Sequence, residues 1–182
     1  MLSKTKFQVT KLDAARRQLK VAISLWFQSG DEVAIHTLAG AAYQIIHDIN
    51  TAKKAGTLLF DSPVFKEEYR KEAINMLKRD VNFFKHADKE PDGVTEFLPA
   101  MSELFIMGAT WGLQNLGLKL DLAEKIFHEW FCLQHPEFLT EKGVCQRANL
   151  QGMREFHELK KLSPHQFFNI FMQAGAQLGH IR

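Results

Sequence analysis

Hydrophobic side chains recur every three or four residues along most of the chain, the period of an α-helix with one buried face. The first such run is predicted to form a helix that ends at Ser29-Gly30. Its apolar positions alternate with Arg16, Arg17 and Lys20, and they are Leu12, Ala15, Leu19, Ala22, Ile23 and Trp26. This pattern predicts an amphipathic helix packed against a core.

A second helix is predicted from about Glu32 to Asn50, with Asp31 as its N-terminal cap. Its main apolar side is expected to carry Ala34, Leu38, Ala42, Ile45 and Ile49. Ser62 followed by Pro63 signals the start of a further helical segment, because serine caps helices and proline is tolerated at the first helical position. This segment, from Val64 to about Asp88, is predicted to form one helix or two.

The second half of the chain carries signals for four more helices, after a turn at residues 90–93. Thr95 is expected to cap the first of them, with Pro99 in its tolerant first turn. Asp121 is expected to cap the second, which the pair His135-Pro136 ends. The four helices are predicted at about residues 95–117, 121–133, 148–161 and 163–177.

The predicted fold class is all-α, a helical bundle of six to eight helices, because no alternating β-branched run indicates a sheet. We expect one all-helical domain over residues 1–182. Its bundle core is placed at about 12–135, with a smaller helical C-terminal extension at about 136–182.

Composition narrows the class of protein without assigning a function. The 182 residues are 46% hydrophobic and 24% charged, which excludes wholesale disorder and is enough for a sizeable core. The formal net charge of +2 argues against a surface dominated by phosphate contacts, although a local basic patch is compatible with it.

Membrane and metal signals are weak in this sequence. The longest uncharged stretch, residues 104–118, is too short to span a bilayer, and the first ten residues lack the apolar core of a signal peptide. We therefore expect a cytoplasmic protein without a membrane segment. Cys132 and Cys145 form no Cys-x-x-Cys pair and are expected to be small buried residues. No metal site is predicted.

Four residues of the second predicted helix, His36, Gly40, Tyr43 and His47, form one narrow stripe away from its main apolar side. Two histidines, a tyrosine and a glycine are not typical of a solvated face, so we expect the stripe to be shielded from water. It is either a second packing surface with hydrogen-bonded histidines or a polar pocket wall that faces residues 79–86. The histidines lie about 16 Å apart along the helix axis, too far to share one metal ion directly.

Residues 79–86 combine groups that can act on a phosphodiester. Arg79 and His86 are seven residues apart, so on a continuous helix they share a face, with Asn82 between them. There Arg79 can stabilise developing charge while His86 transfers a proton. The opposite side is expected to point Leu77, Val81 and Phe84 into the core. The same polar stripe also fits the solvated side of an ordinary amphipathic helix.

An arginine, a polar residue directly after it and a histidine a few residues later, in an all-helical chain, resemble the motif of the HEPN superfamily. Arg79, Asp80 and His86 match that motif at its longest permitted gap. HEPN proteins are small helical bundles, commonly dimers, and many are metal-independent ribonucleases whose motifs face each other across the dimer interface. The resemblance implies that Arg79 and His86 form the catalytic pair and that Asp80 supports them. It covers about residues 12–88.

Two hypotheses of function follow. The first is a HEPN-like protein that acts on nucleic acid or a nucleotide, as a metal-independent ribonuclease if it is an enzyme. RNA or a nucleotide is then its partner, a homodimer its assembly, and no cofactor is needed. Asn82 would position the phosphate, and Lys85 belongs to a modest basic patch compatible with an RNA backbone. The alternative is a non-enzymatic helical dimer that binds a protein partner or small ligand through His36, Tyr43 and His47.

Overall fold

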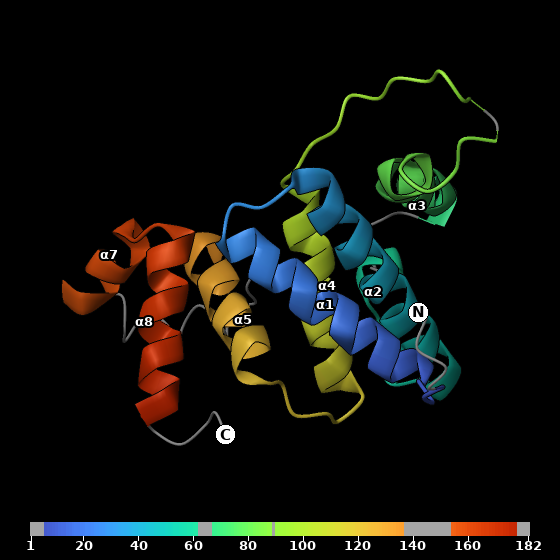
Figure 1. Ribbon diagram of the computed structural model, residues 1–182. Coiled ribbons are helices and arrows are strands. Elements are labelled where there is room, and N and C mark those ends of the chain that lie inside the picture. Colours follow the sequence, from blue (N-terminus) through green and yellow to red (C-terminus); the bar gives the residue numbers. More distant parts are fainter. Residues whose placement is uncertain (1–5, 62–66, 89, 137–153, 178–182) are drawn as a thin grey trace.

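The computed structural model describes residues 6–61, 67–88, 90–136 and 154–177 (Figure 1). Within these ranges the chain forms seven α-helices, one short 3-10 helix and no strand, which confirms the predicted all-α bundle. The elements are α1 (Lys11–Phe27), α2 (Glu32–Lys53), η1 (Leu59–Asp61), α3 (Glu67–Phe83), α4 (Met101–Asn115), α5 (Leu122–Gln134), α7 (Arg154–Lys161) and α8 (Pro164–Gln177).

Side-chain caps set the beginnings of α1, α2 and α5, and the hydroxyl of Ser163 caps α8. At α1 the Thr10 hydroxyl accepts a hydrogen bond from the N–H of Asp13, whose carboxylate accepts one from the N–H of Thr10. Asp121 and Glu124 form the same reciprocal pair at α5. The carboxylate of Asp31 caps α2. The caps predicted at Asp31 and Asp121 are therefore confirmed.

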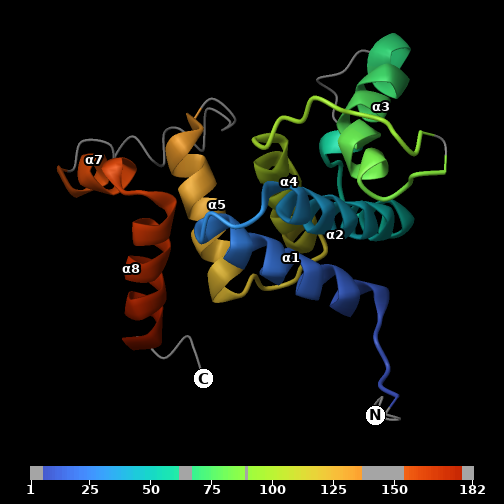
Figure 2. The same cartoon turned by 45° about the horizontal axis from the view of Figure 1, so that its top comes forward.

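Helix α2 lies at the centre of the bundle and is covered on more than one side. It packs along α1 and along α4, and α3 crosses it on a further side. Figure 2 shows α1 and α3 on opposite sides of α2. The fully buried positions of α2 include Ile35, Ala39, Ala42, Tyr43 and Ile46.

Aromatic side chains join the later helices to this centre. Phe27 at the end of α1 lies 6.0 Å, between ring centroids, from Phe127 of α5. The same ring stacks at 4.4 Å on Phe168 of α8. Arg16 of α1 adds a polar link, because its guanidinium donates to the buried carboxylate of Glu124 on α5 at 2.7 Å. Both α5 and α8 are thereby packed onto α1.

The predicted buried side of α2 is wrong in part. Of its five residues only Ala42 is buried; Ala34, Leu38, Ile45 and Ile49 are half-buried. The reason is that α2 packs against neighbours on several sides, so its best-covered positions are not those of its most apolar stripe. Burial here follows from the arrangement of α1, α3 and α4.

Two predicted helix boundaries also need correction. Thr95 does not cap a helix, because α4 begins only at Met101, after Ala100, and its N-terminus has no side-chain cap. The Thr95 hydroxyl donates to Asp80 instead. Helix α3 ends at Phe83, short of residue 88, and the predicted start at residues 62–66 lies outside the described residues.

The C-terminal helices follow the prediction where they are described. Helix α8 runs from Pro164 to Gln177, and α7 covers the end of the helix predicted at 148–161, whose first six residues lie outside the described ranges. Cys132 is buried, as expected, whereas Cys145 lies outside those ranges. Among the described residues, no helix has both the length and the apolar character to cross a membrane.

Glycines allow the close approach of helices to α2, as Gly40 and Gly108 show. A Cβ atom at Gly40 would lie 2.5 Å from Cγ2 of Val81 on α3. A Cβ at Gly108 of α4 would lie 2.7 Å from Cε2 of Tyr43. Both distances are shorter than real contacts, so each helix pair needs glycine at its crossing.

We expect Gly40→Leu to lower the free energy of unfolding by about 1–3 kcal/mol, because a large side chain there must displace Val81. Urea denaturation followed by circular dichroism measures the change. Ala52→Leu, on an exposed position of the same helix, is the control and should stay within about 0.5 kcal/mol of the parent. Equal stability of the Gly40→Leu chain and the parent would contradict the tight α2–α3 contact.

Candidate functional site

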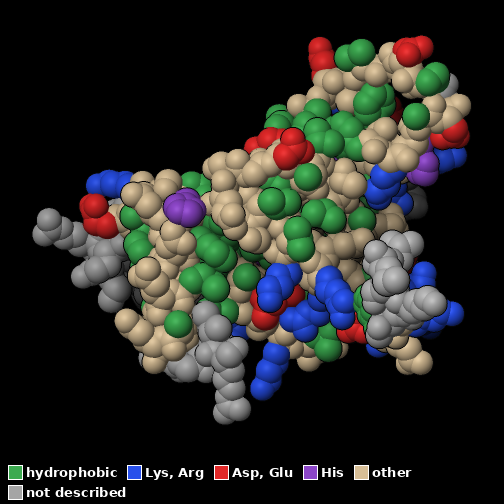
Figure 3. Space-filling model, in the orientation of Figure 1, with side chains coloured by type: hydrophobic (Ala, Val, Ile, Leu, Met, Phe, Trp, Pro, Cys, Tyr) green, Lys and Arg blue, Asp and Glu red, His purple; other side chains and the backbone are tan. Residues whose placement is uncertain are grey.

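A hollow of about 500 Å³ lies where the end of α3 meets the residues that follow it. We call residues 84–100, which join α3 to α4, the connecting segment; in Figure 1 it arcs away from α3 before it returns to the bundle. The side chains that line the hollow are Arg79, Asn82, Phe83, His86, Asp88 and Glu90. Figure 3 shows hydrophobic side chains and side chains of both charges gathered over this part of the molecule.

Arg79 is oriented by a buried carboxylate. Its Nε donates to Oδ1 of Asp80 at 2.9 Å, and its Nη2 donates to the backbone oxygen of Glu96 at 3.0 Å. The hydroxyl of Thr95 donates to the same Asp80 oxygen at 3.1 Å. We call this set, Asp80 with Arg79, Thr95 and Glu96, the Asp80 clamp. It holds the connecting segment against α3, and the hydrogen bond to Asp80 raises the pKa of Arg79.

His86 reaches the hollow in a different way from the one predicted. It does not continue α3, which ends at Phe83, so the expectation of one continuous helical face is wrong. Its backbone N–H still donates to the oxygen of Asn82 at 3.1 Å, so the chain leaves the helix only gradually. The ring of Phe84 packs against the ring of Phe97, with 5.1 Å between the two ring centroids. Arg79, Asn82 and His86 nevertheless line the same hollow.

Two other residues assigned to this site do not line the hollow. Asp80 is buried beneath the connecting segment and acts on the hollow through Arg79. Lys85 is exposed and lies next to His86 in the chain, outside the lining. On the opposite side of α3, Val81 is buried and Leu77 packs against the core, as predicted.

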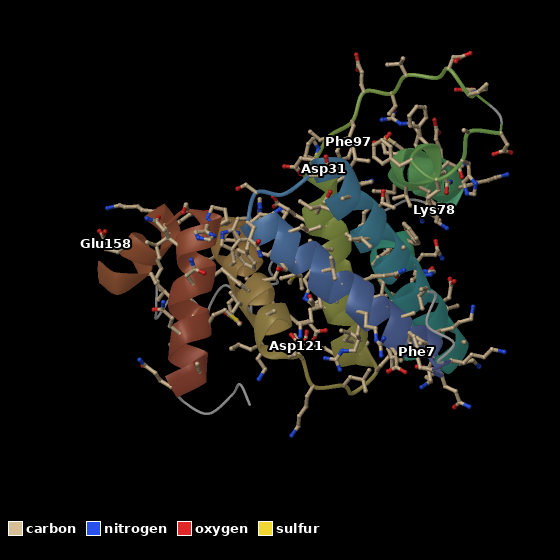
Figure 4. The ribbon with its side chains drawn as sticks, viewed as in Figure 1. Phe7, Asp31, Lys78, Phe97, Asp121 and Glu158 are labelled. Carbon is tan, nitrogen blue, oxygen red and sulfur yellow. The ribbon has the colours of Figure 1, made fainter. Side chains whose placement is uncertain are left out.

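His36 is enclosed by this chain alone. Its side chain is 1% exposed, and its Nδ1 lies 3.1 Å from the hydroxyl of Ser102 on α4. The rings of Phe84, Phe97 and Phe105 surround the imidazole, at 4.9–5.9 Å between centroids. Figure 4 shows Phe97 beside the start of α2, where Asp31 lies. Burial in this setting lowers the pKa of His36, and the Nε2 atom has no hydrogen-bond partner among the described residues.

Tyr43 and His47, two further residues of the predicted stripe, are also covered by other parts of this chain. The Tyr43 side chain is fully buried, and its hydroxyl accepts a hydrogen bond from the N–H of Phe60 at 3.0 Å. Burial raises the pKa of Tyr43. His47 places its Nε2 2.8 Å from a carboxylate oxygen of Asp61, with the ring of Phe60 5.1 Å away. The predicted shielding from water is confirmed, and the stripe packs against α3, α4 and η1 instead of lining the hollow.

The hollow contains three residues that the sequence patterns did not single out, Phe83, Asp88 and Glu90. Helical spacing could not find the last two, because both follow the end of α3, and the turn at residues 90–93 lies against Phe83 through Gly93. The turn at residues 90–93 was predicted, and it was the sequence signal that could have placed residues after α3 near that helix. No group of three histidine, cysteine, aspartate or glutamate side chains in the described part of the chain is arranged to hold a metal ion.

No family model, curated protein or solved structure matches this chain. The resemblance to the HEPN superfamily thus consists of Arg79, Asp80 and His86 in an all-helical setting. Arg79 and His86 line the hollow, and Asp80 orients Arg79.

Acid should destabilise the fold through His36. Because burial lowers its folded pKa below the ordinary 6.5, the unfolded chain binds a proton first as the pH falls. The free energy of unfolding should therefore be unaffected by His36 above pH 6.5 and decrease as the pH falls below it. The charge of Asp80, which favours protonated His36, and that of Lys85, which opposes it, modulate the effect.

Urea denaturation between pH 7.5 and 5 tests this expectation. His36→Gln should show a shallower loss of stability than the parent, whereas His165→Gln, at an exposed position on α8, should keep the parent's slope. Parallel stability curves for the parent and His36→Gln would show that His36 does not titrate with folding.

Proposed function

We propose that the hollow binds RNA and that the protein cleaves the bound phosphodiester without a metal ion. The observation that supports this is the convergence of Arg79, Asn82 and His86 on one hollow, although His86 lies beyond the end of α3. A fixed positive charge, an amide and a titratable imidazole are the groups that such a reaction needs.

Arg79 is suited to stabilise negative charge that develops on the phosphate. Its side chain is 58% exposed, and the hydrogen bonds it makes to described residues use only Nε and Nη2. The two hydrogens on Nη1 therefore stay available to a ligand. Because the Asp80 clamp fixes the guanidinium in advance, little reorganisation is needed when charge develops.

His86 supplies the proton transfer in this proposal. The 2′-oxygen of a ribose forms a bond to phosphorus while the bond from phosphorus to the 5′-oxygen breaks, which gives a 2′,3′-cyclic phosphate and a 5′-hydroxyl. One group must take the proton from the 2′-hydroxyl and another must give a proton to the leaving oxygen. One imidazole fills one of these roles at a time, and His86 of a second copy would fill the other.

The connecting segment supports the proposal of a dimer. Its Val94 and Leu98 are 95% and 60% exposed, close in sequence to the residues of the hollow. Apolar side chains in this position gain free energy if a second copy covers them. The alternative, a non-enzymatic protein that binds a partner or small ligand through His36, Tyr43 and His47, is less favoured, because His36 and Tyr43 are buried within the chain and His47 is half-buried.

His86→Ala should lower the rate of RNA cleavage by roughly 100- to 10,000-fold, the usual contribution of a general acid or base. The assay follows a fluorescent RNA in excess EDTA, where the parent should remain active. Because His86 is exposed, its loss should leave the helical circular dichroism signal and the Tm nearly unchanged. His165→Ala is the matched control and should cleave like the parent. Cleavage that survives in His86→Ala, or that requires a divalent ion, overturns the mechanism.

The combined change Val94→Asp and Leu98→Asp should convert the dimer into a monomer and reduce cleavage, because charged groups would have to enter the interface. Sedimentation equilibrium measures the assembly. Val21→Asp, at an exposed valine of α1, serves as the control and should leave both assembly and cleavage unchanged. A parent chain that is monomeric at assay concentrations and fully active refutes the requirement for two copies.

A further inference from the structure

The hollow holds four polar side chains that are free to bind a ligand. Asn82, His86, Asp88 and Glu90 line it, and none of these side chains makes a hydrogen bond or ion pair with another described residue. Arg79, by contrast, is partly used by the Asp80 clamp. All four side chains are exposed, so each can reach a ligand in the hollow without giving up a contact within the described part of the fold.

Two of these groups do not suit a phosphate. Asp88 and Glu90 are carboxylates, and at short range they repel a phosphodiester. Their oxygens can only accept hydrogen bonds, so they require a part of the ligand that offers donors. In an RNA those donors lie on the ribose hydroxyls and on the bases.

Gly93 lies against both the Cβ of Glu90 and the ring of Phe83. A Cβ atom at Gly93 would lie 3.1 Å from Cβ of Glu90 and also 3.1 Å from Cε2 of Phe83. The N–H of Gly93 donates to the backbone oxygen of Glu90 at 3.0 Å, which closes the turn against that ring. Because Phe83 and Glu90 line the same hollow, it offers a ring on which a base can stack and a carboxylate that can accept hydrogen bonds from a base edge.

We propose that the hollow selects guanine, with the base stacked on Phe83 and its N1–H and N2–H donated to the carboxylate of Glu90. This inference rests on the proposed action on RNA and names the nucleotide that the site prefers. Asp88 contributes a second acceptor to the lining of the hollow, and the phosphate is left to Arg79 and His86.

Guanine follows from the chemistry of the four bases. Its pairing edge carries two adjacent donors, which match the two oxygens of a carboxylate. Adenine and cytosine each place one amino group next to a ring nitrogen that accepts, so a carboxylate meets one favourable and one repulsive group. Uracil offers a single N–H between two carbonyl oxygens. Hydrogen bonds to a charged acceptor are among the stronger ones, so the preference should be measurable.

The test is calorimetric titration of the full chain with 3′-GMP, 3′-AMP, 3′-CMP, 3′-UMP and 3′-IMP in EDTA. We expect 3′-GMP to bind roughly ten- to a hundredfold more tightly than 3′-AMP, 3′-CMP and 3′-UMP. Inosine, which keeps N1–H and lacks the N2 amino group, should bind more weakly than guanosine. Glu90→Gln should remove most of the preference, whereas Asp92→Asn, an exposed carboxylate of the same turn outside the lining, should keep it.

Equal affinities for 3′-GMP and 3′-AMP overturn the inference, and so does a preference that survives in Glu90→Gln. Cleavage of a mixed-sequence RNA separates this failure from failure of the proposed function. Cuts that depend on His86 but fall evenly on all four nucleotides retain the ribonuclease and reject the guanine site. Selective binding of 3′-GMP by a chain that cleaves no RNA retains the guanine site and rejects the ribonuclease.

Discussion

The enclosure of α2 on several sides is the constraint on which the rest of this structure depends. A helix covered by α1, α3 and α4 cannot keep a solvated face along most of its length, so even its histidines and tyrosine must find partners inside the chain. Tyr43 and His47 do so through η1, and His36 does so through Ser102. Gly40 supplies the space that lets α3 approach, and the position of α3 in turn decides where the hollow forms.

The Asp80 clamp connects the packed core to the hollow through hydrogen bonds. Asp80 is buried, so its position is fixed by the core. Its hydrogen bond to Arg79 fixes one wall of the hollow, and its hydrogen bond to Thr95 holds the segment that covers His36. Phe97, on that same segment, packs against the imidazole. A carboxylate that the sequence motif marks as supporting thus has a clear structural role. That role explains the placement of Arg79 whether or not the site is catalytic.

The residues around the hollow divide into those that build it and those that are free. Phe83, Gly93 and the Asp80 clamp account for its shape through contacts within the chain. The side chains of Asn82, His86, Asp88 and Glu90 make no hydrogen bond or ion pair with other described residues, and they combine an amide, an imidazole and two carboxylates. Together with the guanidinium of Arg79, these groups suit a ligand that carries both an anionic part and a part rich in hydrogen-bond donors, and a nucleotide has both.

The sequence by itself determined the features that depend on neighbours within about four residues. Helical periodicity and the caps at Asp31 and Asp121 gave the helices and their beginnings, because a cap and the backbone N–H that it satisfies lie on the same turn. Tertiary structure alone decided which side of α2 is buried, that Thr95 binds Asp80 instead of capping a helix, and that Asp88 and Glu90 join Arg79. Each of these depends on residues farther apart than one helical turn, as Asp80 and Thr95 are 15 positions apart and His36 and Ser102 are 66 positions apart. A local sequence pattern cannot predict such contacts, because they form only when the helices pack.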